Sequence, residues 1–114
     1  LSTRFLHHLP FLAVRVQQLL RMHPRWGKER VAEQLALSGR HLNRKLAEEG
    51  TQFRTILNET RRDLAMAYIR DTELSFGEIA YLLGFSSAEA FQRAFKRWSG
   101  QTPGEFRRER RQTA

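Results

Sequence analysis

The stretches VAEQLALS (residues 31–38) and IAYLLGFS (residues 79–86) follow the same apolar pattern at an offset of 48 positions. Four pairs of apolar residues agree between them: Val31 with Ile79, Ala32 with Ala80, Leu35 with Leu83, and Leu37 with Phe85. A pattern that recurs within one chain is the sequence signature of a repeated structural unit. We therefore interpret the chain as two copies of one small unit.

The match continues after one extra residue in the second copy. At an offset of 49, LNRKL (residues 42–46) lies over FQRAF (residues 91–95), so both copies read apolar, amide, arginine, any residue, apolar. Because a helix turns by about 100° per residue, the two apolar residues of each stretch share one face, and the amide and the arginine lie opposite them. Each copy is therefore expected to contain an amphipathic helix with an exposed amide–arginine pair.

Apolar spacing predicts helices along the whole chain, and hairpin turns of the Asn-Gly or Asp-Gly type do not occur in the sequence. The predicted helices cover residues 11–22, 28–36, 39–49, 52–70, 76–83, 87–98 and 103–110. Four of these helices form two pairs, 28–36 with 39–49 and 76–83 with 87–98. Within each pair, the two helices are joined by a turn of the length found in helix-turn-helix units. The expected fold class is all-α: seven helices that form two helix-turn-helix subdomains (28–49 and 76–98), joined by a long linker helix (52–70).

Three capping boxes, in which a hydroxyl residue is followed three positions later by Glu, are predicted at helix starts. They are Ser75 with Glu78, Ser86 with Glu89, and Thr102 with Glu105. Pro103 follows the third box at the first helical position, where its missing N–H costs little. We expect Glu89 to serve as the return half of its box rather than as a general base.

The charge of the chain favours a polyanionic partner. Twenty Lys and Arg residues against 12 Asp and Glu give a net charge of +8, which points first to nucleic acid and second to an anionic membrane surface. The sequence contains no cysteine, which is consistent with a reducing compartment, and we expect a cytoplasmic, nucleoid-associated location. No apolar run approaches the roughly 20 residues of a membrane span.

The exposed helix faces carry the side chains that read base edges. Arginine can bond O6 and N7 of guanine, and Asn or Gln can bond N6 and N7 of adenine. The outward base-reading candidates are Arg40, Asn43 and Arg44 in the first unit and Glu89, Gln92 and Arg93 in the second. On a single helix such residues usually mark only a solvated surface. Because the arrangement occurs twice, each time after a short helix and a short turn, we interpret both faces as surfaces that read double-stranded DNA.

A wider set of candidate DNA contacts flanks these residues: Ser38, His41, Lys45, Ser86, Ser87, Ala88, Lys96, Arg97, Arg107 and Arg108. The arginines of the carboxyl-terminal tail could bind phosphates or simply keep the end of the chain soluble. Arg61 and Arg62 on the linker helix have the same two interpretations, and there we favour the solvated surface.

The sequence contains no recognisable catalytic motif and no recognisable metal-binding motif. The four histidines are scattered, without partners at the spacing of a zinc site: His7, His8, His23 and His41. A glycine-rich phosphate loop, a nucleophile elbow and a pair of catalytic carboxylates are also missing from the sequence. We predict no catalysis, no cofactor and no bound metal.

One long stretch, SFGEIAYLLGFSSAEAFQRAFKRWSGQTPGEFRR (residues 75–108), resembles the signature of the AraC/XylS family of transcription regulators. That signature reads I-A, G-F-S, F-x-R-x-F-K and G-x-T-P-x-x-[FY]-R in this order. Residues 31–50 match the weaker amino-terminal repeat of the family, and the resemblance covers residues 11–110. It implies two helix-turn-helix units whose second helices enter successive major-groove segments on one face of the duplex.

The resemblance also implies where bases are read. By analogy with the family, the positions fall at Arg40, Asn43 and Arg44 in the first unit, and at Ala88, Glu89, Gln92 and Arg93 in the second. Longer neutral or basic side chains are common in the family where this chain has Ala88 and Glu89. We therefore expect the second helix to read fewer bases directly and to depend more on phosphates and DNA shape.

The family usually carries a ligand-sensing or dimerising domain ahead of this region. Because the chain begins at Leu1, we expect it to be a piece of a longer bacterial regulator, with residues 1–10 as an interdomain linker and 111–114 as a basic tail. The expected partners are promoter DNA and RNA polymerase, which the bound domain recruits or repositions; activation and repression both stay open. Two alternatives stay open at this point: a helical module that binds an acidic protein, and an RNA-binding domain, which the absence of evident aromatic stacking platforms disfavours.

Overall fold

The computed structural model describes residues 11–113. This part of the chain contains seven α-helices, joined by turns and loops, and no strands. The helices are α2 (Phe11–Met22), α3 (Lys28–Gln34), α4 (Gly39–Glu48), α5 (Phe53–Asp71), α6 (Phe76–Leu83), α7 (Ala88–Ser99) and α8 (Pro103–Thr113). The predicted all-α class is confirmed, and α8 extends three residues beyond the predicted end at 110. The linker expected at residues 1–10 lies outside the described residues.

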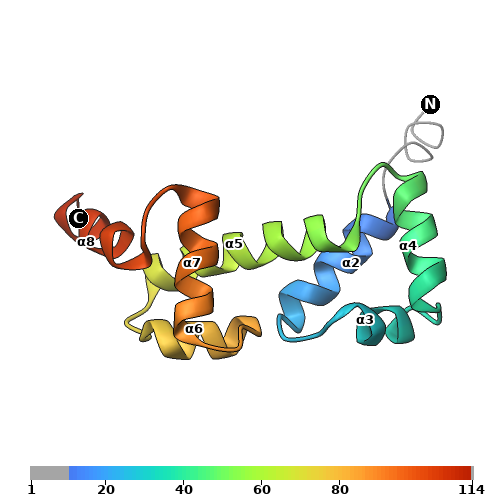
Figure 1. The fold of residues 1–114 in the computed structure, drawn as a ribbon, viewed down its shortest axis with the longest axis horizontal. Coiled ribbons are helices and arrows are strands. Elements are labelled where there is room, and N and C mark those ends of the chain that lie inside the picture. Colours follow the sequence, from blue (N-terminus) through green and yellow to red (C-terminus); the bar gives the residue numbers. More distant parts are fainter. Residues whose placement is uncertain (1–10, 114) are drawn as a thin grey trace.

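The helices form two groups at the two ends of α5 (Figure 1). We call α2, α3 and α4 the first unit, and α6, α7 and α8 the second unit. The molecule is elongated, with extents of 47 × 34 × 21 Å. The long helix predicted at 52–70 therefore does connect the two units.

Each unit has its own apolar core, and α5 contributes to both. The first core contains Val16, Leu20, Val31, Ala32, Leu42, Leu46, Phe53 and Ile56. The second contains Ala65, Ile69, Ile79, Ala80, Leu83, Phe91 and Phe95. The apolar pairs predicted to hold down the outward helices, Leu42 with Leu46 and Phe91 with Phe95, are fully buried. Burial of each such side chain contributes about 1.5–3 kcal/mol, which fixes α4 and α7 against their units.

The two helix-turn-helix turns have the same backbone hydrogen bonds. In the first turn, the N–H of Leu37 donates to the carbonyl of Ala32 at 2.9 Å, and the N–H of Ala36 donates to Glu33 at 3.0 Å. In the second turn, the bonds from Phe85 to Ala80 (2.9 Å) and from Gly84 to Tyr81 (3.1 Å) repeat this pattern. Bonds of these two spacings close a helix as a Schellman motif. The duplication seen in the sequence is thus also present in the backbone.

The two outward helices begin at serines that are 49 positions apart. The Oγ atom of Ser38 accepts a hydrogen bond from the N–H of His41, and that of Ser87 accepts one from the N–H of Ala90, both at 3.0 Å. Such bonds satisfy N–H groups that the first turn of a helix leaves without an intrahelical partner. The extra residue of the second copy is therefore Ser86, between the Schellman motif and the cap.

The predicted capping box of Ser86 with Glu89 is wrong for this reason. Ser87 is the capping residue of α7, and Glu89 is an exposed residue in its first turn. The other two predicted boxes are confirmed. The backbone N–H of Ser75 donates to Glu78 at 3.0 Å and that of Thr102 to Glu105 at 2.8 Å, each with the return bond at 3.1 Å.

Candidate nucleic-acid interface

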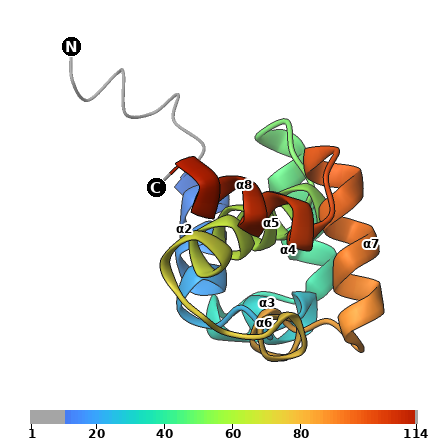
Figure 2. The ribbon, with the colours of Figure 1, turned by 90° about the vertical axis from the view of Figure 1, so that its left-hand side faces the viewer.

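Helices α4 and α7 lie on the same face of the molecule. Figure 1 shows them running in the same direction, each starting beside the short helix that precedes it. Figure 2, which looks along the long axis, places both on one side of the molecule, with α2 on the other. Two helices arranged in this way can meet one elongated partner at the same time.

The outward face of α4 carries the predicted polar residues. Arg40, Asn43 and Arg44 are exposed, whereas Leu42 and Leu46 point into the first core. Of the wider set of candidates in this unit, His41 and Lys45 are half-buried, and Ser38 is exposed with its hydroxyl oxygen bound at the cap. The structure thus brings the three base-reading candidates of the first unit together on one exposed face.

The outward face of α7 has the same layout with one reversal of charge. Gln92 and Arg93 are exposed at the positions that correspond to Asn43 and Arg44, and Glu89 corresponds to Arg40. The neighbouring candidates Ser86, Lys96 and Arg97 are exposed, and Ser87 and Ala88 are half-buried. The reversal makes the start of α7 less attractive to phosphates than the start of α4.

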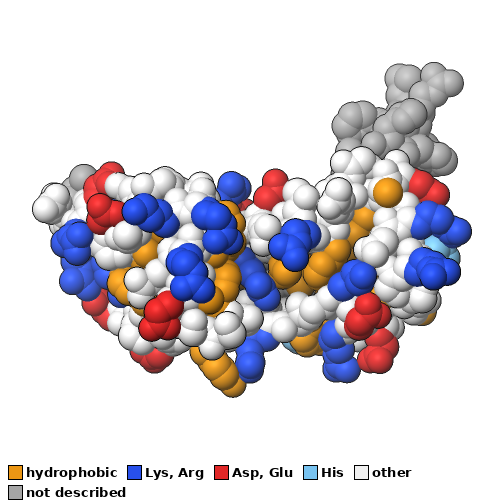
Figure 3. All heavy atoms as spheres, viewed as in Figure 1, with side chains coloured by type: hydrophobic (Ala, Val, Ile, Leu, Met, Phe, Trp, Pro, Cys, Tyr) orange, Lys and Arg blue, Asp and Glu red, His pale blue; other side chains and the backbone are white. Residues whose placement is uncertain are grey.

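Basic side chains are spread over the face that carries both helices. Figure 3, in the same view as Figure 1, shows Lys and Arg side chains over the first and the second unit, with some apolar side chains exposed between them. A basic face that extends over both units is suited to an extended polyanion, because each neutralised phosphate releases counterions.

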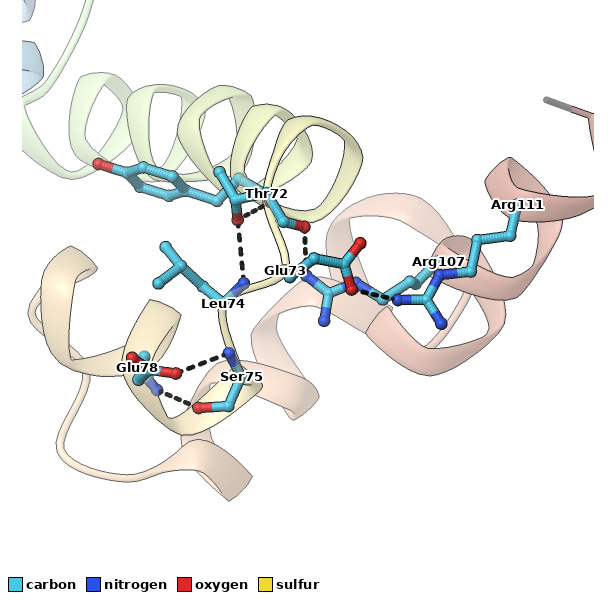
Figure 4. Close-up of polar contacts among 8 residues, drawn as sticks. Thr72, Glu73, Leu74, Ser75, Glu78, Arg107 and Arg111 are labelled. Atoms are coloured by element: carbon cyan, nitrogen blue, oxygen red, sulfur yellow. Dashed lines mark hydrogen bonds and ion pairs between the residues drawn. The ribbon is translucent and has the colours of Figure 1, made fainter.

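Helix α8 uses two of its arginines to attach itself to the connection between α5 and α6 (Figure 4). An Nη atom of Arg107 donates to the carbonyl of Thr72 at 3.4 Å, and its guanidinium lies 4.9 Å from the ring centre of Phe76. Arg111 pairs with Glu73 at 2.6 Å. Arg107 therefore has a structural role, Arg108 is exposed, and a DNA contact by either arginine stays a prediction.

A contact that the sequence did not reveal joins the start of α2 to the end of α4. The carboxylate of Glu49 accepts hydrogen bonds from the backbone N–H groups of Leu12 (3.0 Å) and Ala13 (2.9 Å). These N–H groups belong to the first turn of α2, where no intrahelical acceptor is available. The residues are 36 and 37 positions apart, and no local pattern connects them.

The remaining titratable side chains do not form a metal site. Within residues 11–113, no group of three or more His, Cys, Asp or Glu side chains is placed to hold a metal ion. His23 instead stacks on Trp26, with ring centres 3.9 Å apart. Of the helices in this part of the chain, none has the length and apolar character to cross a membrane.

Comparison with known proteins identifies the family. Residues 31–109 match a family described as a helix-turn-helix domain, and over 100 residues the chain is 40% identical to the ornithine utilization regulator of Pseudomonas aeruginosa. The regulator VirS of Mycobacterium tuberculosis is 38% identical over 79 residues. The chain belongs to the AraC family of helix-turn-helix transcription regulators.

Solved structures agree with this assignment. A DNA-binding transcriptional dual regulator from Escherichia coli K-12 superposes with a TM-score of 0.81 at 28% identity, covering 89% of this chain and 93% of that one. The regulator CdpR from Pseudomonas aeruginosa has a TM-score of 0.77 at 36% identity, covering 85% of this chain and 31% of its own. This AraC-type domain is therefore a DNA-binding domain of a transcription regulator and not an enzyme.

The curated relatives are much longer than this domain. The match to the ornithine utilization regulator covers 84% of this chain but only 29% of that protein. The match to VirS covers 69% of this chain and 23% of that protein. The relatives therefore contain further sequence outside the DNA-binding domain.

Proposed function

We propose that this AraC-type domain binds one promoter site as a single chain, with α4 and α7 in two successive major-groove segments on one face of the duplex. The common direction and common face of the two helices support this arrangement (Figures 1 and 2). The 47 Å length of the molecule exceeds the roughly 34 Å of one DNA turn. Both helices can then reach the same side of a straight or slightly bent duplex.

The observation that carries the proposal is the repeated amide–arginine pair. Asn43 with Arg44, and Gln92 with Arg93, are exposed at corresponding positions of α4 and α7. Each pair lies opposite two fully buried apolar residues, so that its direction is fixed. In the proposed complex the arginines bond guanine and the amides bond adenine.

The two helices read DNA to different extents in this proposal. Arg40 provides a third long donor in α4, whereas the corresponding Glu89 can only accept, for example from the amino group of cytosine. Ala88 is too short to bond a base edge. Helix α7 therefore reads fewer bases and depends more on phosphate contacts from Lys96 and Arg97 and on DNA shape.

The proposal extends to the regulator as a whole. The domain acts at the nucleoid in the cytoplasm, and once bound beside a promoter it regulates transcription by recruiting or repositioning RNA polymerase. An effector-binding or dimerisation domain precedes it in the full protein. The greater length of the relatives supports this domain organisation.

Selection of bound sequences from a random duplex pool at near-physiological salt tests the proposal. We expect two preferred blocks about one helical turn apart, and binding of the selected site at least ~10³-fold tighter than binding of a scrambled control. Recovery of no motif, with equal binding to both duplexes that disappears as the salt concentration rises, would show that only a basic surface is present.

A further inference from the structure

Three segments that are distant in the sequence meet between the two units. They are the loop between α2 and α3, the middle of α5, and the end of α6 with the turn that follows it. Figure 1 shows this loop beside that turn, below α5. We call the residues that meet there the junction: Pro24, Arg25, Arg61, Tyr81, Gly84 and Phe85.

The loop and the second unit are in direct contact in the junction. The guanidinium of Arg25 lies 4.0 Å from the ring centre of Tyr81, which is cation–π geometry. A Cβ atom built on Gly84 would lie 3.2 Å from the Cα of Arg25 and 3.4 Å from the carbonyl oxygen of Pro24. The two backbones are therefore packed so closely that a side chain at position 84 would crowd the loop.

Arg61 fills the space between α5 and this contact. Its guanidinium lies 5.0 Å from the ring centre of Phe85, and an Nη atom would be 2.8 Å from a Cβ on Gly84. Partial burial lowers the pKa of Arg61, and among the described residues its Nε atom has no hydrogen-bond partner. The side chain thus packs chiefly through its planar group, which supports the turn from the side of α5.

The junction provides a second connection between the units. One helix, α5, would by itself allow each unit to twist and bend relative to the other as the helix flexes. The contact of the loop with α6 and its turn closes a ring that contains α5, Arg25 and Tyr81. The relative position of α4 and α7 is then held at two places.

We propose that the junction sets the spacing of the two DNA blocks that this domain accepts, with Arg25 and Tyr81 as positioning residues for α4 and α7. This inference rests on the proposed two-block binding and adds its spacing rule. Insertion of one base pair moves the second block by about 3.4 Å and turns it by about 34°. A domain with the junction intact cannot follow this change, and a domain without it follows more easily.

The test measures Kd for the selected site and for the same site with one base pair inserted between the blocks. We divide Kd for the site with the inserted base pair by Kd for the selected site. This ratio is compared among wild type, Tyr81→Ala, Tyr81→Phe and Leu82→Ala. Because both DNAs meet the same protein sample, the fraction of folded protein cancels from the ratio. We expect a ratio about two- to five-fold smaller for Tyr81→Ala, the size of one exposed cation–π contact.

The control variants separate the contact from the helix that carries it. Tyr81→Phe keeps the ring under Arg25, and Leu82→Ala changes an exposed residue of α6 outside the junction, so both should keep the wild-type ratio. Arg25→Ala should lower the ratio as much as Tyr81→Ala, and the double variant should lower it no further, because the two residues form one contact.

Three results would contradict the inference or its basis. An unchanged ratio in both Tyr81→Ala and Arg25→Ala would overturn the spacing role. Equal weakening of both DNAs by Arg25→Ala, with a smaller salt dependence, would make Arg25 a phosphate contact instead. If wild-type protein bound the selected and scrambled sites equally, the two-block proposal itself would fail. This comparison uses no inserted base pair, so it distinguishes failure of the two-block proposal from failure of the spacing rule.

Discussion

Ala36 and Gly84 occupy the same position in the two helix-turn-helix turns, and both have left-handed backbone conformations, with φ of 58° and 89°. Each is followed by an apolar residue whose N–H closes the preceding helix. An L residue with a side chain pays about 1–2 kcal/mol for this conformation, and glycine does not. The first turn is therefore strained where the second is relaxed.

Replacement of Ala36 by glycine should stabilise the domain. The strain relieved at φ 58° exceeds the added entropy of the unfolded chain, and we expect a gain of about 0.5–1 kcal/mol. Urea unfolding followed by circular dichroism measures it. Ala47→Gly, at an exposed position within α4, is the matched control and should lose about 1 kcal/mol. Destabilisation by both variants would show that Ala36 is not strained.

The reverse change, Gly84→Ala, should destabilise the domain. The new methyl group meets the left-handed penalty and also lies 2.8 Å from an Nη atom of Arg61 and 3.2 Å from the Cα of Arg25. We expect a loss of about 1–3 kcal/mol in urea unfolding. Gly77→Ala, in the first turn of α6 with no close atom besides the Oγ of Ser75 at 3.9 Å, should be neutral or stabilising. A neutral Gly84→Ala would contradict the close packing of the junction.

Loss of the Glu49 carboxylate should loosen the start of α2. Two backbone N–H groups, those of Leu12 and Ala13, lose their acceptor, and Glu49→Ala should cost about 1–2 kcal/mol. Hydrogen exchange should become faster at these two amides before it does so in the core. Glu48→Ala, at the exposed neighbouring position, is the control. Unchanged protection of both amides in Glu49→Ala would show that the carboxylate is dispensable.

Acid should weaken the domain partly through its two capping boxes. The pKa of Glu78 and that of Glu105 lie below the ordinary value of 4.5, because each carboxylate accepts a backbone N–H, from Ser75 and Thr102 respectively. A lowered folded-state pKa gives stability that is present above about pH 4.5 and lost as the pH falls through the lowered pKa. The urea midpoint should therefore fall between pH 5 and pH 3. The midpoint should fall less over this pH range in the double variant Glu78→Gln/Glu105→Gln. If the midpoint fell equally in the variant and in wild type, the capping boxes would not be the cause of the acid sensitivity.

Local features explain why the helices could be predicted from the sequence. Apolar periodicity and hydroxyl caps act within a few residues, and α2 and α6 begin and end where they were expected, at Phe11–Met22 and Phe76–Leu83. The exposure of Asn43, Arg44, Gln92 and Arg93 follows from the same periodicity, because the residues opposite them are buried. Which bases these side chains contact stays a prediction.

Features that depend on tertiary contacts or on turn geometry could not be predicted. Ser86 and Ser87 are both serines and are equally able to cap a helix. The extra residue in the second turn places Ser87, and not Ser86, at the start of α7. The contact of Arg25 with Tyr81 joins residues 56 positions apart and exists only because α5 brings the two units together. No periodicity or motif of the sequence signals it.

The most direct test of the central claim is the binding of Arg44→Ala and Arg93→Ala to every single-base variant of the selected site. If α4 and α7 read separate blocks, each variant should bind the selected site more weakly by about 1–3 kcal/mol and lose its preference at one base pair. The two base pairs should lie in different blocks. If both variants instead bound the selected site as tightly as wild type, or weakened all sequences alike, the two-helix readout would be contradicted.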